Sequence, residues 1–471
     1  MKLGELAGIA SDSKVTGFAL DHRKVAPGNI FGAFRGSRFN GEDFIEEAVR
    51  RGAVAIVAGP GASVAGVPHL QADEPRKLFA EIASRFFAPY PDAIVAVTGT
   101  NGKTSTVELT RQLWRMAGYR SASIGTLGVT TADDQVKTGL TTPDIVTFLS
   151  NMAGLKRMGI SHVAYEASSH GLDQFRAEAV PVRAAAFTNF SRDHLDYHSD
   201  MDSYFAAKMR LFDEVVLDDA AAVVWTGDAK SAEVIDHAKR RGLKLITVGP
   251  DAETIELVSR QSTPLGQQLL LRHEGKEHKL SLPLIGAYQM NNVLTAAGLV
   301  LATGSDWATT LSGMARVAPV RGRLERAVIS RFGAPVYVDY AHTPDAVEAA
   351  IAALRPHVEG RLITVLGAGG DRDEGKRPEM GAVAERLSDV VIVTDDNPRS
   401  EDPAAIRKAV LVGAPNAIEV SDRRAAIGEA IAMAKAGDIV LVAGKGHEQG
   451  QIMGDQVLPF DDVTVARECA A

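Results

Sequence analysis

The chain has 471 residues, of which 45% are hydrophobic and 23% charged, and its formal net charge at pH 7 is −8. One hydrophobic core does not hold a chain of this length, so about three domains are expected. The negative charge argues against a nucleic-acid-binding protein, because affinity for a phosphate backbone comes mainly from excess Lys and Arg.

Two further features concern the cellular setting. The chain has one cysteine, Cys469, which lacks a partner for an internal disulfide, so a reducing compartment is expected. The first residues carry no long apolar segment, and no stretch reaches the roughly 18 apolar residues that span a bilayer. The sequence therefore predicts a cytoplasmic enzyme that binds neither nucleic acid nor a membrane.

The beginning of the chain predicts a small α/β domain. Residues 30–34 and 54–57 are short apolar runs that predict strands, and a helix is expected between them over residues 41–51. A second helix is expected over residues 75–87. The proline-containing segment 88–91 then predicts a stiff domain boundary.

A glycine-rich turn follows this boundary. Residues 93–97 are apolar and predict a buried parallel strand, and helical spacing begins by Val107 and ends near Gly118. The turn between them, TGTNGKTS (residues 98–105), offers backbone N–H groups, a lysine and a hydroxyl, which together favour a phosphate-binding loop with Mg²⁺. Only two residues separate its glycines, so an ordinary glycine-rich turn remains an alternative.

Two later strands, predicted over residues 162–165 and 184–187, each end in a polar turn. Carboxyl ends of neighbouring parallel strands converge on one crevice, so Glu166 and His194 in these turns are expected to face Lys103. A carboxylate there would complete a magnesium shell. The alternative is that Glu166 and His194 only brace their own turns.

The rest of the chain continues the α/β pattern. A hairpin is expected within residues 258–282, and a helix around residues 292–297. Beyond residue 321, strands are expected over residues 362–365, 390–394 and 439–442. Helices are expected between these strands over residues 344–354 and 403–412, the latter begun by Asp402 and Pro403. We predict an N-terminal α/β domain (residues 1–90), a central P-loop domain with a mostly parallel sheet (91–320) and a C-terminal Rossmann-like domain (321–471).

The motifs, taken in order, resemble those of the ATP-dependent Mur ligases of peptidoglycan synthesis. The resemblance rests on residues 98–104, 166–172, 192–196, 339–342 and 444–448, and it extends over nearly the whole chain. DNPR (residues 396–399) is similar to the signature of the branch that adds meso-diaminopimelate. The resemblance implies an ADP-forming ligase that joins this amino acid to UDP-N-acetylmuramoyl-L-alanyl-D-glutamate through an acyl phosphate, with a monomer expected.

The resemblance also implies roles for individual residues. Lys103 would hold the β- and γ-phosphates of ATP, Thr104 one Mg²⁺, and Glu166 with His194 a second. Lys208 matches the lysine that the family carbamylates with CO₂, which would turn a cation into an oxygen ligand for Mg²⁺. By itself, Lys208 also fits a solvated or snorkelling helix lysine.

The implied binding residues form three sets. The nucleotide would contact Gly99, Thr100, Asn101, Gly102, Lys103, Thr104, Ser105, Asn292, Arg323 and Asp339. The muramoyl substrate would contact Leu20, His22, Ser37, Arg38, Thr141, Thr142, Ser168, Gln174 and Arg176. The incoming amino acid would contact Arg372, Asp396, Asn397, Pro398, Arg399, Gly444 and Glu448.

The amino-acid set also has a physical rationale. Diaminopimelate has one carboxylate more than lysine, and an arginine such as Arg399 pairs with a carboxylate through two charge-assisted hydrogen bonds. Glu448 would take the ammonium at the same end. Alternatively, residues 396–399 form only an Asn-Pro turn with a surface arginine.

The chain departs from the family pattern at three positions. His22 stands where the family has a serine, Gln289 where it commonly has an asparagine, and Ala167 where it has a valine. These departures question single contacts rather than the reaction. Because the two ligand sites fall on different predicted domains, the third domain is expected to close on the second.

Three other functions are compatible with part of the sequence. A lysine-adding ligase would differ at Arg399, and a folylpolyglutamate synthase would lack the tetrapeptide at residues 396–399. A nucleotide-binding switch would use the glycine loop without joining anything, and it predicts no ADP release that depends on an amino acid.

Overall fold

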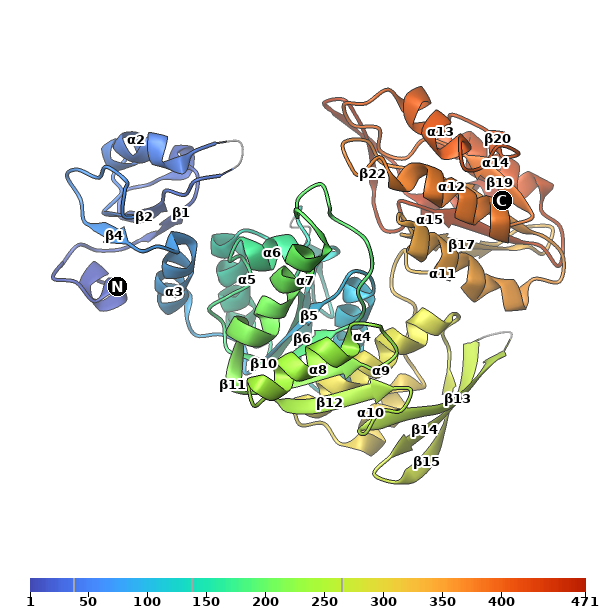
Figure 1. Ribbon diagram of the computed structural model, residues 1–471, viewed down its shortest axis with the longest axis horizontal. Coiled ribbons are helices and arrows are strands. Elements are labelled where there is room, and N and C mark those ends of the chain that lie inside the picture. Colours follow the sequence, from blue (N-terminus) through green and yellow to red (C-terminus); the bar gives the residue numbers. More distant parts are fainter. Residues whose placement is uncertain (37–38, 137–138, 264–265) are drawn as a thin grey trace.

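The computed structural model describes residues 1–36, 39–136, 139–263 and 266–471. Its sheets lie in three successive parts of the chain, which we call the first, central and third units. Figure 1 shows the first unit at the left and the third unit at the upper right, both joined to the central unit below them. The mixed α/β fold predicted from the sequence is confirmed.

The first unit is a short parallel sheet in the order β1-β2-β3-β4. Its predicted strands are confirmed as β2 and β3, and the predicted helix over 75–87 is confirmed as α3; the helix over 41–51 is divided into a 3-10 turn and α2. Apolar α3 residues, including Phe79, pack in the same hydrophobic cluster as Phe148 of the central unit. The elements are α1 (Leu3–Ala7), β1 (Gly17–Ala19), η1 (His22–Lys24), β2 (Asn29–Gly32), η2 (Gly41–Phe44), α2 (Ile45–Arg50), β3 (Ala55–Ala58), β4 (His69–Gln71) and α3 (Pro75–Phe87).

The central sheet runs β15-β14-β13-β12-β11-β10-β5-β9-β6-β7-β8, with parallel pairing from β13 through to β6. The strands are β5 (Ala93–Thr98), β6 (Ser121–Gly125), β7 (Gly128–Thr130), β8 (Gln135–Val136), β9 (His162–Glu166), β10 (Val182–Phe187), β11 (Val216–Trp225), β12 (Lys244–Gly249), β13 (Ile255–Thr263), β14 (Gly266–His273) and β15 (Lys276–Leu282). The expected hairpin is a three-stranded meander, because β13 also pairs antiparallel with β14.

Helices cover both faces of the central sheet, which explains why β5 is apolar along its whole length. Ile94 and Ala96 of β5 pack in the cluster that includes α3, α5 and α7, whereas Val95 and Val97 pack in the cluster that includes α4 and α9. The helices are α4 (Lys103–Met116), α5 (Ile145–Arg157), α6 (Ser169–Asp173), α7 (Met201–Arg210), the π-helix η3 (Leu211–Val215), α8 (Ser231–Arg240), α9 (Ala287–Ala302) and α10 (Trp307–Met314).

The third unit has the sheet order β16-β17-β21-β18-β19-β20, in which only β16 is antiparallel to its neighbour. The expected cap of α13 is confirmed, since Asp402 accepts from the N–H of Ala404 and Pro403 begins the helix. The elements are β16 (Glu325–Ile329), β17 (Pro335–Asp339), α11 (Pro344–Leu354), η4 (Arg355–His357), β18 (Leu362–Leu366), α12 (Lys376–Leu387), β19 (Val390–Val393), α13 (Pro403–Leu411), β20 (Ile418–Glu419), α14 (Arg423–Met433), β21 (Ile439–Ala443), β22 (Gly450–Met453), β23 (Gln456–Pro459) and α15 (Asp462–Ala470).

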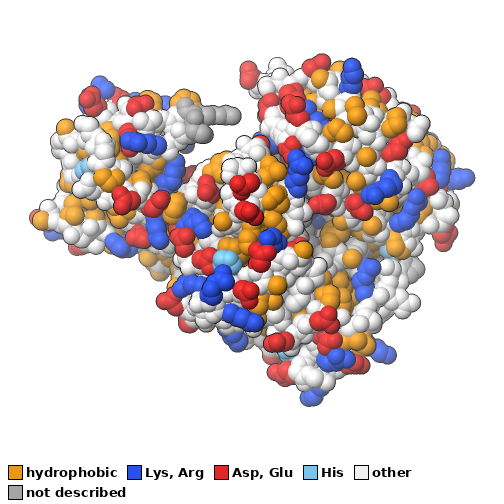
Figure 2. Space-filling model, in the orientation of Figure 1, with side chains coloured by type: hydrophobic (Ala, Val, Ile, Leu, Met, Phe, Trp, Pro, Cys, Tyr) orange, Lys and Arg blue, Asp and Glu red, His pale blue; other side chains and the backbone are white. Residues whose placement is uncertain are grey.

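The face drawn in Figure 2 is hollowed between the first unit and the third, above the central unit, and both acidic and basic side chains lie on the rim. Within the described ranges, no helix is both long enough and apolar enough to cross a bilayer.

Candidate nucleotide and substrate site

The glycine loop connects β5 to α4, as predicted. Gly99 and Gly102 have φ angles of 142° and 84°, which residues with a side chain rarely adopt. A Cβ atom at Gly102 would collide with the side chain of Asn292. The loop is held by the neighbouring turn after β10, because the N–H of Asn101 donates to Asn189 Oδ1 over 2.8 Å and the Thr188 hydroxyl donates to the Asn101 carbonyl over 2.6 Å. The loop is therefore a braced structure whose glycines are required by geometry.

Two lysines converge on the Gly99 carbonyl. Lys103 Nζ donates to the carbonyl oxygens of Gly99 and Thr100 over 2.8 and 2.7 Å, and Lys208 Nζ donates to Gly99 over 2.7 Å. Lys208 is only 1% exposed, so the interpretation of a solvated helix lysine is wrong. Burial, with a smaller effect of Lys103, lowers the pKa of Lys208 well below its ordinary value.

Glu166 and Thr104 meet beside this loop. Glu166 ends β9 and is 2% exposed; its carboxylate accepts from the Thr104 hydroxyl over 3.0 Å and from the N–H of Thr126 over 2.7 Å. Burial raises the pKa of Glu166, and the charge of Lys103 opposes that shift. Arg323 Nη2 donates to the Thr104 hydroxyl over 3.0 Å. The predicted convergence of Glu166 on the glycine loop is confirmed in position.

His194 lies at the same end of the sheet, but its neighbours are Asp193 and His170 rather than Glu166 and Thr104. Its Nε2 atom is 3.6 Å from Asp193 Oδ2, and its ring is 4.8 Å from that of His170. Burial lowers the pKa of His194 to about 3, although Asp193 opposes the shift, so the imidazole is neutral at pH 7. Across the described ranges, no three His, Cys, Asp or Glu side chains form a cluster that is ready to hold a metal ion.

A cavity of about 310 Å³ adjoins the glycine loop. Asn292 of α9, Arg323 and Asp339 all line it, so the structure brings the predicted nucleotide residues of three segments together. Asp339 accepts from the N–H of Leu324 over 2.6 Å, and burial raises its pKa to about 6. The Arg323 guanidinium stacks 4.4 Å above the Tyr340 ring, and its buried Nε atom has no hydrogen-bond partner among the described residues.

A larger cleft of about 780 Å³ separates the central and third units. Thr141 and His194 line its central side. All of the predicted amino-acid residues except Pro398 line the opposite side, namely Arg372, Asp396, Asn397, Arg399, Gly444 and Glu448. Pro398 is buried and does not line the cleft.

The predicted muramoyl residues divide into two groups. The Thr142 hydroxyl lies 3.0 Å from Ser168 Oγ, Arg176 donates to the Thr142 carbonyl over 2.9 Å, and Gln174 donates to the Tyr197 hydroxyl over 2.9 Å. Leu20 and His22 belong to the first unit and line neither the cavity nor the cleft.

Two other observations complete the muramoyl set. The His22 ring stacks on Phe44 at 4.1 Å, which gives this departure from the family pattern a local structural role. Ser37 and Arg38 lie outside the described residues.

Several lining residues were not predicted from the sequence. His170 and His342 belong to the motifs at residues 166–172 and 339–342, so membership of those motifs was an available signal. Lys376, at the start of α12, also lines the cleft. It carries no sequence signal, because only the packing of the third unit against the central one brings it there.

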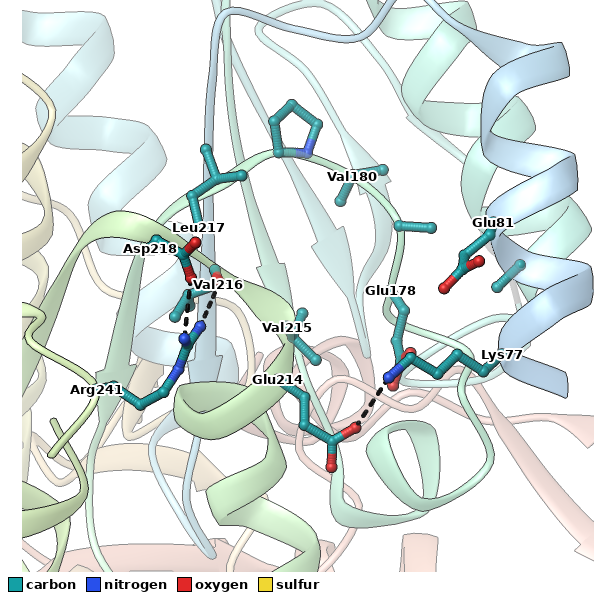
Figure 3. A pocket seen from close by; sticks show the side chains of 13 residues that line it. Lys77, Glu81, Glu178, Val180, Glu214, Val215, Val216, Leu217, Asp218 and Arg241 are labelled. Atoms are coloured by element: carbon teal, nitrogen blue, oxygen red, sulfur yellow. Dashed lines mark hydrogen bonds and ion pairs between the residues drawn. The ribbon is translucent and has the colours of Figure 1, made fainter. Parts of the chain in front are cut away.

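A third hollow, of about 520 Å³, lies between α3 and the start of β11. Figure 3 shows two ion pairs in this hollow: Lys77 Nζ lies 3.6 Å from Glu214, and Arg241 Nη1 lies 2.9 Å from Asp218. None of the predicted site residues line it, so it is separate from the candidate site.

The fold and site define an α/β protein in which a Rossmann-like unit faces a second unit, which carries the glycine loop, across a cleft. Residues 97–300 match the Mur ligase middle domain, and residues 322–446 match the Mur ligase glutamate ligase domain. The chain therefore belongs to the Mur ligase family.

Comparison with individual proteins gives more specific similarities than the family. The chain is 59% identical to a Zymomonas mobilis protein named UDP-N-acetylmuramoyl-L-alanyl-D-glutamate--2,6-diaminopimelate ligase, over 99% of this chain and 98% of that protein. A solved structure with the same name is 31% identical, covers 100% of this chain and 98% of its own, and has a TM-score of 0.73. MurF ligase from Thermotoga maritima in complex with ADP, at 19% identity over 97% of both chains and a TM-score of 0.63, shares the fold.

Proposed function

We propose that the chain is an ADP-forming ligase that joins meso-diaminopimelate to UDP-N-acetylmuramoyl-L-alanyl-D-glutamate. The observation that carries the proposal is the cleft in which Arg399, Asn397 and Glu448 face the central unit beside the glycine loop. The similarity to relatives that bear the name of this activity supports it. We further propose a cytoplasmic monomer with domains over residues 1–90, 91–320 and 321–471.

In the first chemical step, an oxygen of the D-glutamyl γ-carboxylate attacks the γ-phosphorus of ATP, and the bond to ADP breaks. Lys103 would leave the carbonyls of Gly99 and Thr100 and bind the phosphates, for which the loop N–H groups and helix α4 provide further donors. Arg323 suits the same anion, because its buried Nε lacks a partner among the described residues. The product is an acyl phosphate.

Mg²⁺ fits the oxygen donors next to the loop. The Thr104 hydroxyl and the Glu166 carboxylate are 3.0 Å apart, and hard oxygens are the ligands that Mg²⁺ prefers while it keeps part of its water. The neutral ring of His194 has a lone pair to offer nearby. When bound, Mg²⁺ would neutralise the negative charge that gathers on the phosphates.

Lys208 is the residue we propose to be carbamylated. Its lowered pKa provides a neutral amine, whose nitrogen can bond to the carbon of CO₂ and lose one proton to give a carbamate anion. The carbamate would be attracted to the cationic Lys103, whereas a neutral amine is not. A ¹³C NMR signal from protein incubated with labelled bicarbonate, absent in Lys208→Met, would support this assignment; equal spectra of both proteins would contradict it.

In the second step, the amino nitrogen of diaminopimelate attacks the acyl carbon, phosphate leaves and one proton is released. The Arg399 guanidinium lines the cleft and uses Nη1 to donate to the Gly370 carbonyl over 2.7 Å. Its remaining N–H groups can pair with the carboxylate that distinguishes diaminopimelate from lysine.

The decisive measurement is ADP release with the muramoyl dipeptide substrate and either meso-diaminopimelate or L-lysine. We expect strong preference for diaminopimelate in the native chain. Arg399→Ala should raise KM for diaminopimelate by at least about 30-fold, because a charge-paired hydrogen bond is worth about 2 kcal/mol or more. Arg386→Ala, at an exposed ion pair with Glu348 on the same unit, serves as the matched control.

Each other outcome is informative. No ADP release with either amino acid would remove the ligase proposal and favour a nucleotide-binding switch. Release with lysine alone would retain the reaction but overturn the role of Arg399.

A further inference from the structure

Lys445 is a fully buried cation behind the amino-acid side of the cleft. Its side chain is 0% exposed and does not line the cleft. Its Nζ atom donates to the Gly450 carbonyl over 2.7 Å and to Asn397 Oδ1 over 3.0 Å, and it lies 3.5 Å from Glu448 Oε2. Burial of a charge is costly unless the charge is paired and hydrogen-bonded. These three contacts offset the cost of burying the Lys445 ammonium.

These contacts determine which way the Asn397 amide points. Its Oδ1 atom accepts from Lys445 and also from the N–H of Ile452 over 2.9 Å. Two donors on one atom identify that atom as the oxygen. The amide nitrogen is therefore on the other side, where it donates to Glu448 Oε2 over 2.6 Å. Within the described ranges, one N–H of Asn397 and Oε1 of Glu448 therefore remain available for a ligand.

The electrostatics of the pocket also depend on Lys445. Asp396 and Glu448 are two acidic groups on the same wall, and Lys445 Nζ is 4.0 Å from Asp396 Oδ1. Burial and the charge of Asp396 raise the pKa of Glu448, whereas Lys445 opposes that rise. Removing the cation would therefore favour protonation of Glu448 and weaken its attraction for an ammonium group.

The same network reaches Arg399 through the hairpin of β22 and β23. Lys445 binds the hairpin at Gly450, the N–H of Arg399 donates to the Ile452 carbonyl over 3.0 Å, and the N–H of Gly454 donates to the Arg399 carbonyl over 2.7 Å. Arg399 has a φ of 52°, a conformation that a non-glycine residue keeps only where its surroundings hold it. Lys445 thus contacts the segment that fixes the Arg399 backbone.

We propose that Lys445 is a positioning residue for the incoming amino acid: it turns the Asn397 N–H group toward the substrate and holds Glu448 in place for the substrate ammonium. The inference rests on the proposed ligase function. Because Lys445 is buried behind the wall, it acts through Asn397 and Glu448 and does not touch the substrate.

The test compares Lys445→Met with Lys435→Met, an exposed lysine before the opposite end of β21. KM values are measured separately for diaminopimelate, ATP and the muramoyl substrate by ADP release. Lys445→Met should raise KM for diaminopimelate by at least about 10-fold, the effect of losing one hydrogen bond to a charged group. The other two KM values should stay within about 2-fold. A general loss of folding would instead lower the apparent kcat without a selective rise in one KM. Lys445→Gln, which retains a donor for Asn397, should recover part of the loss.

A second variant keeps the inference falsifiable if Lys445→Met does not fold. Asn397→Asp leaves an acceptor for Lys445 but removes the donor to Glu448, and it should raise the same KM. The inference would be overturned if the KM for diaminopimelate were normal in a Lys445 variant that folds, or in Asn397→Asp. In that case, ADP release by the native chain would still support the ligase function. No ADP release from the native chain would overturn both.

Discussion

The glycine loop and the amino-acid pocket both contain buried lysines, but the partners differ. Lys103 and Lys208 donate to backbone carbonyls of the loop, and neither forms an ion pair within the described ranges. Lys445 instead contacts the side chains of Asn397 and Glu448. An anion bound at the loop can therefore displace weak carbonyl contacts, whereas the amino-acid pocket is already arranged around its cation. The first site is expected to rearrange on binding, and the second to stay in place.

The largest effect should follow from removing the loop lysine. Lys103→Met eliminates the cation expected on the transferred phosphate, so kcat for ADP release should fall by at least about 10²- to 10³-fold. The native level of thermal stability should remain, because Lys103 contacts only carbonyls. Lys239→Met, on the exposed side of α8, is the control. An activity loss below about 10-fold would contradict a phosphate-binding role.

Removing the buried ion pair of the third unit should lower the free energy of unfolding. Arg423 and Asp462 are both fully buried, with Nη2 2.7 Å from Oδ2, and Arg423 also donates to the Ala443 carbonyl at the end of β21 over 3.0 Å. Arg423→Met leaves an uncompensated carboxylate, so the free energy of unfolding should fall by about 3–5 kcal/mol in urea titrations. Adding Asp462→Leu should restore much of it, and failure of the double variant to do so would contradict this explanation.

A smaller, pH-dependent change in the free energy of unfolding is expected from Asp339, which lines the cavity beside the glycine loop. The pKa of Asp339 rises from 3.8 to about 6 on burial, so the folded chain binds more protons than the unfolded one between these values. The unfolding free energy should therefore decrease as pH rises from about 4 to 6, by at most about 3 kcal/mol. Asp339→Asn should lack this decrease. Parallel pH profiles of the two proteins would disagree with the assignment.

The smallest expected change is in overall shape. The third unit already contacts the glycine loop through the 3.0 Å hydrogen bond from Arg323 to Thr104, while a cleft of about 780 Å³ remains open beside it. Binding an ATP analogue together with the muramoyl substrate should close the cleft and reduce the radius of gyration in X-ray scattering. Equal scattering with and without ligands would count against closure.

The sequence by itself determined the local elements and the order of the chemical motifs. Apolar run, glycine turn and helix identified β5, the loop and α4, and Asp402 with Pro403 identified the start of α13, because such signals act over a few residues. Strand-end geometry also predicted that Glu166 and His194 lie at one edge of the sheet. The amino-acid side of the cleft was predicted from the resemblance of residues 396–399 and 444–448 to family motifs.

Tertiary structure decided what depends on distant partners. The pairing of β13 with β14, the arrival of Lys376 at the cleft and the stacking of His22 on Phe44 have no local signal, because each requires a segment placed by the whole fold. The burial of Lys208 and Lys445 is of the same kind. A lysine looks alike in the sequence whether it is solvated or enclosed. Only the packing around it sets its partners and, at Lys208, lowers its pKa.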